Sequence, residues 1–173
     1  MKAYYDSPIG LIELTGEREG LEGCSFLKQS QLAFSLDKTK ASLARAPEPL
    51  VAAWQQLDEY FRGTRREFSL PLWLEGTNFQ NKVWCELQKI PYGETRTYGE
   101  IAAACSRPGA ARAVGRANHH NPLVIIIPCH RVIAADGSLV GFGAGLWRKT
   151  WLLAHERKMS GYFSPSDKEA SIK

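Results

Sequence analysis

The pattern of apolar residues changes near Glu75-Gly76, and this change constrains the fold more than any other feature of the chain. Before it, short apolar stretches are separated by Ser-Pro and by single glycines, a pattern typical of strands joined by tight turns. After it, apolar residues recur every three or four positions, which is typical of helices. A chain of 173 residues can form two small domains. We therefore expect an α/β (α+β) protein with a small N-terminal α/β domain over residues 1–76, a mostly helical C-terminal domain over 77–160 and a polar tail over 161–173.

Within the first part, residues 47–62 are predicted to form an amphipathic helix. Pro49 lies near its first turn and Gly63 just past its end, as helix termini prefer. The segment REFSLPLWL, residues 66–74, returns to a strand pattern. The apolar positions of the helix repeat at intervals of three and four: Leu50, Val51, Trp54, Leu57, Tyr60 and Phe61. Strands, a helix and a further strand predict a small α/β domain.

The second part begins with Thr77 and Gln80, which form a T-x-x-Q capping box at the start of a helix. Further on, the stretches YGEIAAAC, SRPG and AARAVGRANHHN predict a helix, a turn and a second helix, the outline of a helix-turn-helix. Arg112 and Arg116 are four residues apart and share a face of the second helix. Many helical hairpins bind no nucleic acid, so a purely structural helix pair remains an alternative.

The net charge of +4 is distributed unevenly. Residues 1–75 carry nine basic and eleven acidic side chains, whereas residues 76–173 carry thirteen and seven. Between Glu100 and Asp136 the sequence contains four arginines and no acidic residue. A surface of one sign attracts polyanions such as nucleic acids, although chance clustering on a solvated face is also possible.

The segment PCHRV follows the apolar run at 123–127, which predicts a buried strand with Cys129 at its end. A cysteine reacts only as a thiolate, and His130 is the nearest candidate base. Neighbouring side chains of a strand point to opposite faces, so His130 would act after a bend or through a water. Glu156 is a candidate to orient His130, and Arg131 could add a positive field. The spacing alone leaves a packing role for Cys129 open.

No cofactor or metal is expected. The four cysteines are widely spaced and form no CxxC pair. The glycine-rich stretch AADGSLVGFGAGL lacks the phosphate-loop pattern. No apolar run is long enough to span a bilayer, and the N-terminus lacks the apolar core of a signal peptide. We expect a cytoplasmic protein, or a nuclear one in a eukaryote, with no membrane partner.

Three ordered stretches within residues 77–156 resemble the O6-alkylguanine-DNA alkyltransferases. The segment NPLVIIIPCHRV, with GLWRKTWLLAHE after it, is similar to their acceptor region. TNFQNKVWCELQKIPYGETRTYGEIA is similar to the part before their DNA-binding unit, and RPGAARAVGRANHHNP to their recognition helix. The first 75 residues match more loosely. The resemblance implies a ribonuclease-H-like first domain and a helical second domain with a helix-turn-helix.

The same resemblance implies a role for several residues. Cys129 would accept the alkyl group. His130 would act, through a water, as the base that keeps Cys129 as a thiolate. Glu156 would orient His130, and Asn121 would hold the turn before the acceptor segment. Tyr98 would donate a proton or a hydrogen bond to the guanine ring. It would also crowd the DNA backbone phosphate, so that the nucleotide swings out. The implied DNA contacts are Thr97, Tyr98, Arg112, Ala113, Gly115 and Arg116, and the implied substrate pocket is Pro128, Val140, Phe142 and Gly143.

The implied activity is DNA repair. The damaged O6-alkylguanine would be flipped out of double-stranded DNA by a recognition helix in the minor groove, with Arg112 filling the gap. The thiolate would take the alkyl group in one irreversible displacement, so each molecule acts once, without a cofactor or metal. We expect a monomer that could bind DNA cooperatively.

Two other readings of the residues remain. Cys129, His130 and Glu156 also fit a cysteine hydrolase, which would turn over through an acyl-enzyme. The basic helix pair also fits a DNA-binding module without chemistry.

Overall fold

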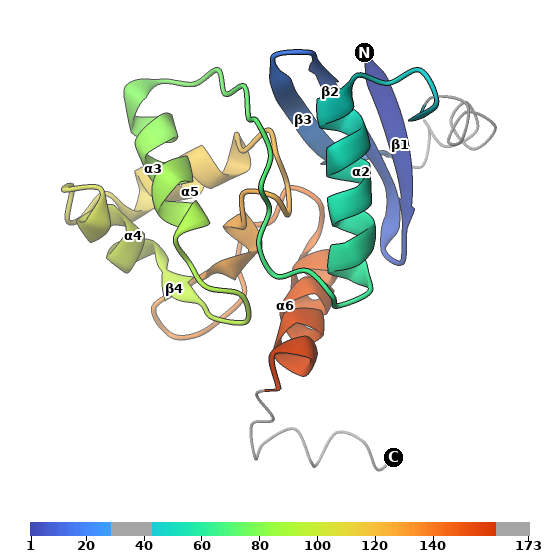
Figure 1. The fold of residues 1–173 in the computed structure, drawn as a ribbon. Helices are drawn as coiled ribbons and strands as arrows, with labels where there is room; N and C mark the ends of the chain where they lie inside the picture. Colours follow the sequence, from blue (N-terminus) through green and yellow to red (C-terminus); the bar gives the residue numbers. More distant parts are fainter. Residues whose placement is uncertain (29–42, 162–173) are drawn as a thin grey trace, which may run out of the picture.

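The structure, a computed structural model, describes residues 1–28 and 43–161 (Figure 1). It confirms the mixed α/β architecture, with a small N-terminal sheet and a mostly helical C-terminal part. Most of the expected polar tail, residues 162–173, lies outside the described residues. The elements in chain order are β1 (Lys2–Ser7), β2 (Gly10–Glu17), β3 (Gly20–Phe26), α2 (Glu48–Phe61), α3 (Asn78–Gln88), β4 (Arg96–Thr97), α4 (Tyr98–Ala104), α5 (Ala111–His119), the 3-10 helix η3 (Cys129–Arg131), β5 (Val132–Ile133) and α6 (Leu146–Ser160).

The N-terminal part is an antiparallel sheet of β1, β2 and β3, and α2 packs on one of its faces (Figure 1). Tight turns close both hairpins, as the glycines predict. The amphipathic helix expected over residues 47–62 is confirmed, with Pro49 in its first turn. Gly63 follows it with φ of +78°, a conformation that glycine adopts at little cost.

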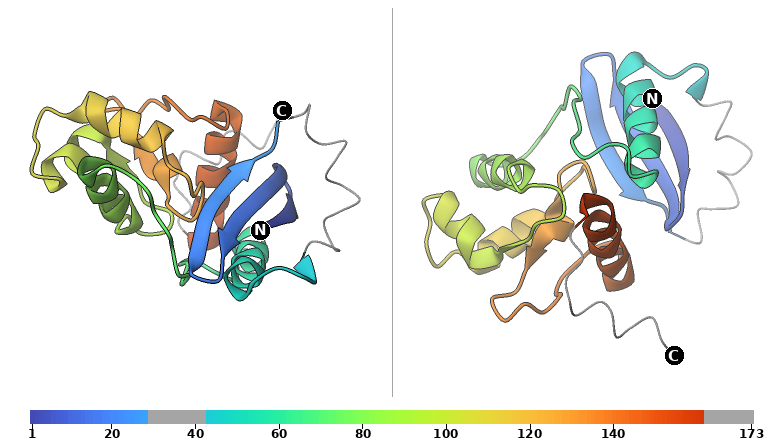
Figure 2. Two further views of the ribbon diagram at one scale, coloured as in Figure 1. Left: turned by 90° about the horizontal axis from the view of Figure 1, so that it is seen from above. Right: turned by 60° about the horizontal axis from the view of Figure 1, so that its bottom comes forward.

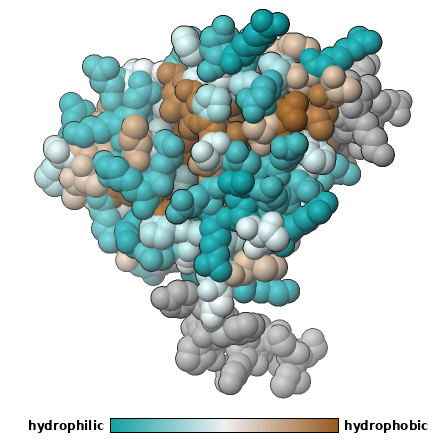
Figure 3. Space-filling model, viewed as in Figure 1, coloured by the Kyte–Doolittle hydropathy of each residue, from teal (hydrophilic) through white to brown (hydrophobic). Residues whose placement is uncertain are grey.

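The strand expected over residues 66–74 is not formed. Only Leu72 makes a β-bridge, parallel to Leu21. Pro71 has no N–H to donate, so this stretch cannot continue a ladder on both sides. The connecting segment instead crosses between α2 and α3, where Figure 3 shows apolar surface.

In the C-terminal part, the capping box at the start of α3 is confirmed, and α4 and α5 form the expected helix pair. The strands β4 and β5 form a short parallel ladder beside them. Figure 2 shows α6 between these helices and the sheet. Helix α6 is bonded to the N-terminal part at two points, because Arg148 Nε donates to the Ile9 carbonyl at 2.8 Å and His155 Nε2 lies 2.9 Å from the Tyr60 carbonyl.

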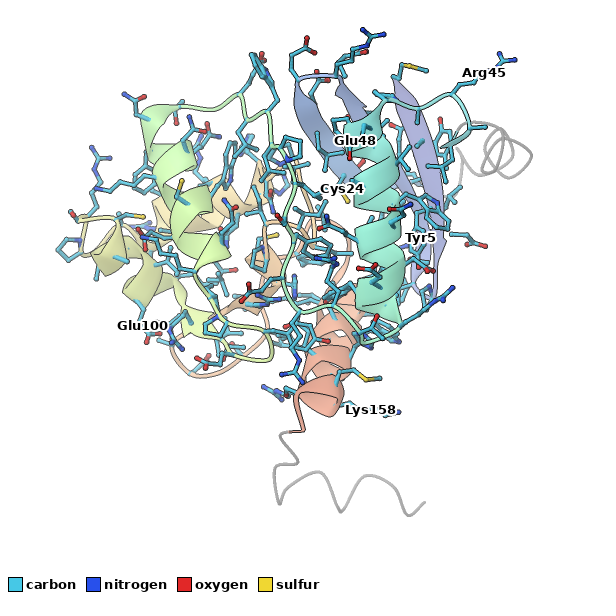
Figure 4. All side chains as sticks on the ribbon, in the orientation of Figure 1. Tyr5, Cys24, Arg45, Glu48, Glu100 and Lys158 are labelled. Atoms are coloured by element: carbon cyan, nitrogen blue, oxygen red, sulfur yellow. The ribbon has the colours of Figure 1, made fainter. Side chains whose placement is uncertain are left out.

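The strand predicted over residues 123–127 was also wrong. The run is buried, but it forms a turn: the Ile127 amide donates to the Leu123 carbonyl at 2.8 Å, and Ile125 has φ of +76°. It joins the sheet through a bridge between Leu123 and Cys24, at the edge that β3 presents to the helical part (Figure 4). The chain therefore enters the PCHRV segment as a tight bend, which brings residues before and after the bend together.

Candidate functional site

Cys129 lies in a pocket of about 650 Å³ and is almost fully buried, with 6% of its surface exposed. It is the first residue of η3, so Cys129 and His130 follow one another in a helical turn and not in a strand. The alternation of faces expected for a strand therefore does not apply to them. The pocket walls include Tyr98, Gly115, Asn121, Phe142 and Gly143.

The Asn121 side chain holds the bend on which Cys129 sits. Its Nδ2 donates to the Ile127 carbonyl at 2.8 Å and to Cys129 Sγ at 3.1 Å, while its Oδ1 accepts from the Leu123 amide at 3.0 Å. All polar positions of the amide are thus used, and one N–H points at the sulfur. Burial raises the pKa of the Cys129 thiol, whereas the Asn121 amide acts to lower it because it stabilises the thiolate.

His130 and Glu156 form a completely buried pair behind the thiol. His130 Nε2 lies 2.8 Å from Glu156 Oε1, and both side chains have no exposed surface. Because Oε1 is an acceptor, Nε2 carries the proton, and His130 Nδ1 keeps its lone pair. Nδ1 is buried and has no hydrogen-bond partner among the described residues, and no direct bond joins this ring to Cys129 there. Burial lowers the pKa of His130 below its ordinary 6.5 despite the neighbouring carboxylate.

Glu156 also pairs with Arg131, whose Nε and one NH2 group lie 2.9 Å from its two oxygens. Burial alone would raise the pKa of this carboxyl, but His130 and Arg131 hold it well below its usual range. Glu156 is therefore an anion at any ordinary pH. The sequence suggested Arg131 as a source of positive field for the thiol, and the structure places that charge against Glu156 instead.

Lys149, on the first turn of α6, was not anticipated. It is fully buried, and its Nζ donates to the carbonyls of Val132 at 2.6 Å and Val140 at 2.8 Å. No carboxylate pairs with it among the described residues. Burial lowers the pKa of Lys149, and proximity to Cys129 offsets part of that shift. The Lys149 ammonium in turn opposes the rise in the pKa of Cys129 that burial causes. In the sequence it is one more polar position in a helix, without a motif to mark it.

Tyr98 stands at the start of α4, directly after Thr97, whose side chain caps that helix together with Glu100. Its hydroxyl donates to the Val140 carbonyl at 3.1 Å. Burial raises the pKa of Tyr98, and proximity to Cys129 raises it further, so the hydroxyl keeps its proton.

Two expected wall residues lie elsewhere. Pro128 lines a second cavity, of about 360 Å³, together with Tyr92 and Arg131, because the turn at η3 directs it away from Cys129. Val140 is 42% exposed and contributes its carbonyl to Tyr98 and Lys149. Conversely, Ser25 and Phe26 of β3 line the pocket of Cys129, so the N-terminal sheet supplies part of its wall, which the sequence did not predict.

The helix α5 borders the pocket through Gly115 and presents its basic face outward. Arg112 and Arg116 are exposed and form no ion pair with any described residue, while Ala113 is half-buried. The buried Trp84 of α3 donates from Nε1 to the Ala117 carbonyl at 3.0 Å and fixes the helix from behind. A cation-bearing helix with small residues beside a reactive thiol can approach a polyanion closely.

The described ranges, 1–28 and 43–161, contain neither a candidate metal site nor a membrane-spanning helix. No group of three or more His, Cys, Asp or Glu side chains is arranged there to hold a metal ion. None of the helices there has both the length and the apolar composition to cross a membrane.

Comparison with known sequences finds two family models. Residues 1–74 match the ribonuclease-like domain of 6-O-methylguanine DNA methyltransferase, and residues 78–158 match its DNA binding domain. The chain is 48% identical over 155 residues to the methylated-DNA–protein-cysteine methyltransferase of Mycolicibacterium paratuberculosis, with 90% of this chain and 91% of the relative covered. It is 47% identical to the protein of that name from Methanosarcina acetivorans over 154 residues, with 89% and 96% covered.

Solved structures agree with this. The crystal structure of Mycobacterium tuberculosis OGT in complex with DNA superposes with a TM-score of 0.79 at 45% identity, covering 91% of this chain and 93% of that one. An O6-methylguanine DNA methyltransferase from Methanococcus jannaschii superposes with a TM-score of 0.66 at 29% identity over the same shares.

Proposed function

The chain belongs to the 6-O-methylguanine DNA methyltransferase family, and we propose that it repairs O6-alkylguanine in duplex DNA by transferring the alkyl group to its own Cys129. One observation carries the proposal: a buried thiol that accepts a hydrogen bond from Asn121 opens into a pocket beside an exposed basic helix. Relatives named for this reaction and a relative solved with DNA support it.

The step begins with removal of the thiol proton. His130, the residue after Cys129, has a free lone pair on Nδ1 and takes the thiol proton through a bridging water. The Asn121 amide and the Lys149 ammonium stabilise the sulfur anion that remains. Glu156 holds the ring so that Nδ1, and not Nε2, is the base.

The thiolate then attacks the alkyl carbon. The S–C bond forms as the bond from carbon to guanine O6 breaks, and the electron pair leaves with the guanine ring. The Tyr98 hydroxyl, freed from the Val140 carbonyl, donates to that ring and stabilises its developing charge. The product is a thioether at Cys129, a bond that neither water nor a second thiol readily breaks, so each molecule acts once.

The guanine must leave the duplex to reach this pocket, because O6 is inaccessible in stacked DNA. Extrusion costs a few kcal/mol, and less for a damaged base that pairs poorly. Contacts from Thr97 and Arg116 to the phosphates, and insertion of Arg112 into the gap, offset part of this cost. The small residues Ala113 and Gly115 allow α5 to enter the minor groove.

The proposal includes the organisation of the whole protein. Residues 1–76 act as the N-terminal domain and 77–160 as the DNA-binding and acceptor domain. The protein works in the cytoplasm, or in the nucleus of a eukaryote, as a monomer.

Incubation with duplex DNA that carries O6-methylguanine tests the proposal. We expect one methyl group transferred per protein molecule, in the peptide that contains Cys129. Cys129→Ala should bind the same DNA and transfer nothing, whereas a DNA-binding module without chemistry would not distinguish the two proteins. Repeated turnover, as a cysteine hydrolase shows, or methylation elsewhere with Cys129 free, would contradict the proposal.

A further inference from the structure

The N-terminal part reaches the buried His130–Glu156 pair through one residue, Tyr60, near the end of α2. The Tyr60 hydroxyl donates to Glu156 Oε1 at 2.8 Å, and the Tyr60 carbonyl accepts from His155 Nε2 at 2.9 Å. Tyr60 has no exposed surface. Two successive residues of α6 are therefore bonded to a single residue of the other part of the chain.

The hydroxyl of Tyr60 competes with His130 for the same oxygen. Oε1 of Glu156 accepts from three donors, namely Tyr60, His130 and Arg131 NH2, all within 2.9 Å. Oε2 accepts from Arg131 Nε at 2.9 Å and from the Gly93 amide at 3.1 Å. An oxygen with about two lone-pair sites cannot bond three donors at full strength. Each additional donor at Oε1 therefore weakens the pull that the carboxylate exerts on His130.

Packing alone does not require this hydroxyl. The ring of Tyr60 lies in an aromatic cluster with Phe61, Phe68, Tyr92 and His155, where phenylalanine would fill the same space. Tyr92 offers a direct comparison, because its hydroxyl is also buried near Glu156 and has no hydrogen-bond partner among the described residues. The bond from Tyr60 to Glu156 is thus a specific feature of Tyr60.

We propose that Tyr60 is a positioning residue for the acceptor thiol: its hydroxyl limits how strongly Glu156 draws the proton of His130, and so sets the basicity of His130. The consequence for alkyl transfer rests on the proposed function. Three other polar groups face this network: Arg131 in η3, Lys149 in α6 and Tyr92 in the loop before β4. All three stay the same when the Tyr60 hydroxyl is removed.

The proposal predicts a specific pH signature. Without the Tyr60 hydroxyl, Oε1 bonds His130 more strongly, and the pKa of His130 rises. Near neutral pH the thiol then gives up its proton to His130 more readily, and transfer is faster. At acid pH His130 is protonated in either protein, so the rate depends on the thiol alone and stays the same.

The test compares Tyr60→Phe with the matched variant Tyr92→Phe, which deletes a nearby buried hydroxyl that bonds no described residue. We expect the pKa of His130, followed by NMR titration of the free protein, to rise by up to about one unit in Tyr60→Phe, the scale of one hydrogen bond. Tyr92→Phe should titrate like the unmodified protein. Transfer by Tyr60→Phe should be up to about tenfold faster near neutrality and unchanged at the acid end of the profile.

A third protein covers the case in which Tyr60→Phe does not fold. Incorporation of 3,5-difluorotyrosine at position 60 keeps the shape of the ring and makes the hydroxyl a stronger donor, so the pKa of His130 should fall. The proposal is overturned if His130 titrates alike in all these proteins, or if Tyr60→Phe is slower by the same factor at every pH. The NMR titration needs no DNA, so it decides this point even if the unmodified protein transfers no alkyl group, a result that would refute only the proposed function.

Discussion

Lys149 Nζ and the Tyr98 hydroxyl donate to the same acceptor, the carbonyl of Val140, at 2.8 and 3.1 Å. A cation in the first turn of a helix opposes the helix dipole, so Lys149 does not stabilise α6 by its position. A buried ammonium without a carboxylate partner is costly unless an anion compensates it. We expect the thiolate of Cys129 to be that anion, so the same lysine holds the Val140 loop that Tyr98 contacts and favours the reactive form of the thiol.

Replacement of Lys149 by methionine should therefore slow alkyl transfer in a pH-dependent way. The pKa of Cys129 should rise by about one unit or more, which reduces the rate about tenfold near pH 7. The deficit should shrink as the pH rises and the thiol ionises in both proteins. Lys158→Met changes an exposed lysine on the same helix and serves as the control (Figure 4). A rate profile of Lys149→Met parallel to that of the control at all pH values would refute the electrostatic role.

Glu156→Gln should destabilise the fold strongly, because it leaves the guanidinium of Arg131 buried without its counter-charge. The loss of one partner from a buried ion pair costs about 3–5 kcal/mol of the free energy of unfolding. The exposed pair Glu94–Arg96 provides the contrast, with its side chains 50% and 42% exposed. Glu94→Gln should cost no more than about 1 kcal/mol. Denaturant titration measures both values, and similar losses in the two variants would show that burial does not strengthen the Glu156 pair.

Stability should fall on acidification from about pH 7 towards pH 5. The folded state depresses the pKa of His130 below its ordinary 6.5, so the unfolded chain binds a proton first as the pH falls. The stability that neutral His130 contributes is therefore complete above pH 6.5 and is lost below it, at up to about 1.4 kcal/mol per pH unit. Unfolding measured at several pH values should show a flatter slope for His130→Gln than for the unmodified protein, and an equal slope would contradict this assignment to His130.

Arg112→Ala should slow repair of duplex DNA more than reaction with free O6-methylguanine. Arg112 is exposed on α5 and makes no ion pair with a described residue, so its removal leaves the pocket of Cys129 unchanged. We expect weaker binding and slower transfer on the duplex, as measured by a DNA titration and a single-turnover assay. Arg157→Ala, at an exposed arginine of α6, controls for the loss of one positive charge. Equal slowing on both substrates would contradict a role in base extrusion.

Local patterns predicted the helices well. The capping box at Thr77 and the helix pair after it depend on residues close in sequence, and both form as expected. The strands expected at 66–74 and 123–127 failed for equally local reasons. Pro71 lacks the N–H that a ladder needs, and Ile125 adopts a positive φ that a continuous apolar run does not reveal.

The candidate site could be predicted only where a motif marks it. Cys129 and His130 are adjacent and stand out, whereas Lys149 and Tyr60 look like ordinary positions on two helices. The contact of Tyr60 joins residues far apart in the chain: 96 positions separate it from Glu156. Such pairings depend on how α2 and α6 dock, which is a property of tertiary packing and leaves no periodic signal.

The two hydrogen bonds that join Tyr60 to α6 have a consequence for protein engineering. The N-terminal part, with its sheet and α2, cannot be exchanged freely for that of a relative, although it does not contain the acceptor cysteine. A chimera that combines the acceptor half of this chain with the N-terminal part of a relative should keep the pH profile of this protein only if the graft supplies a tyrosine at this point of α2 and the same docking angle. Comparison of pH profiles across a shuffled library of chimeras would reveal that dependence at one aromatic position, distant in sequence from every residue of the acceptor motif.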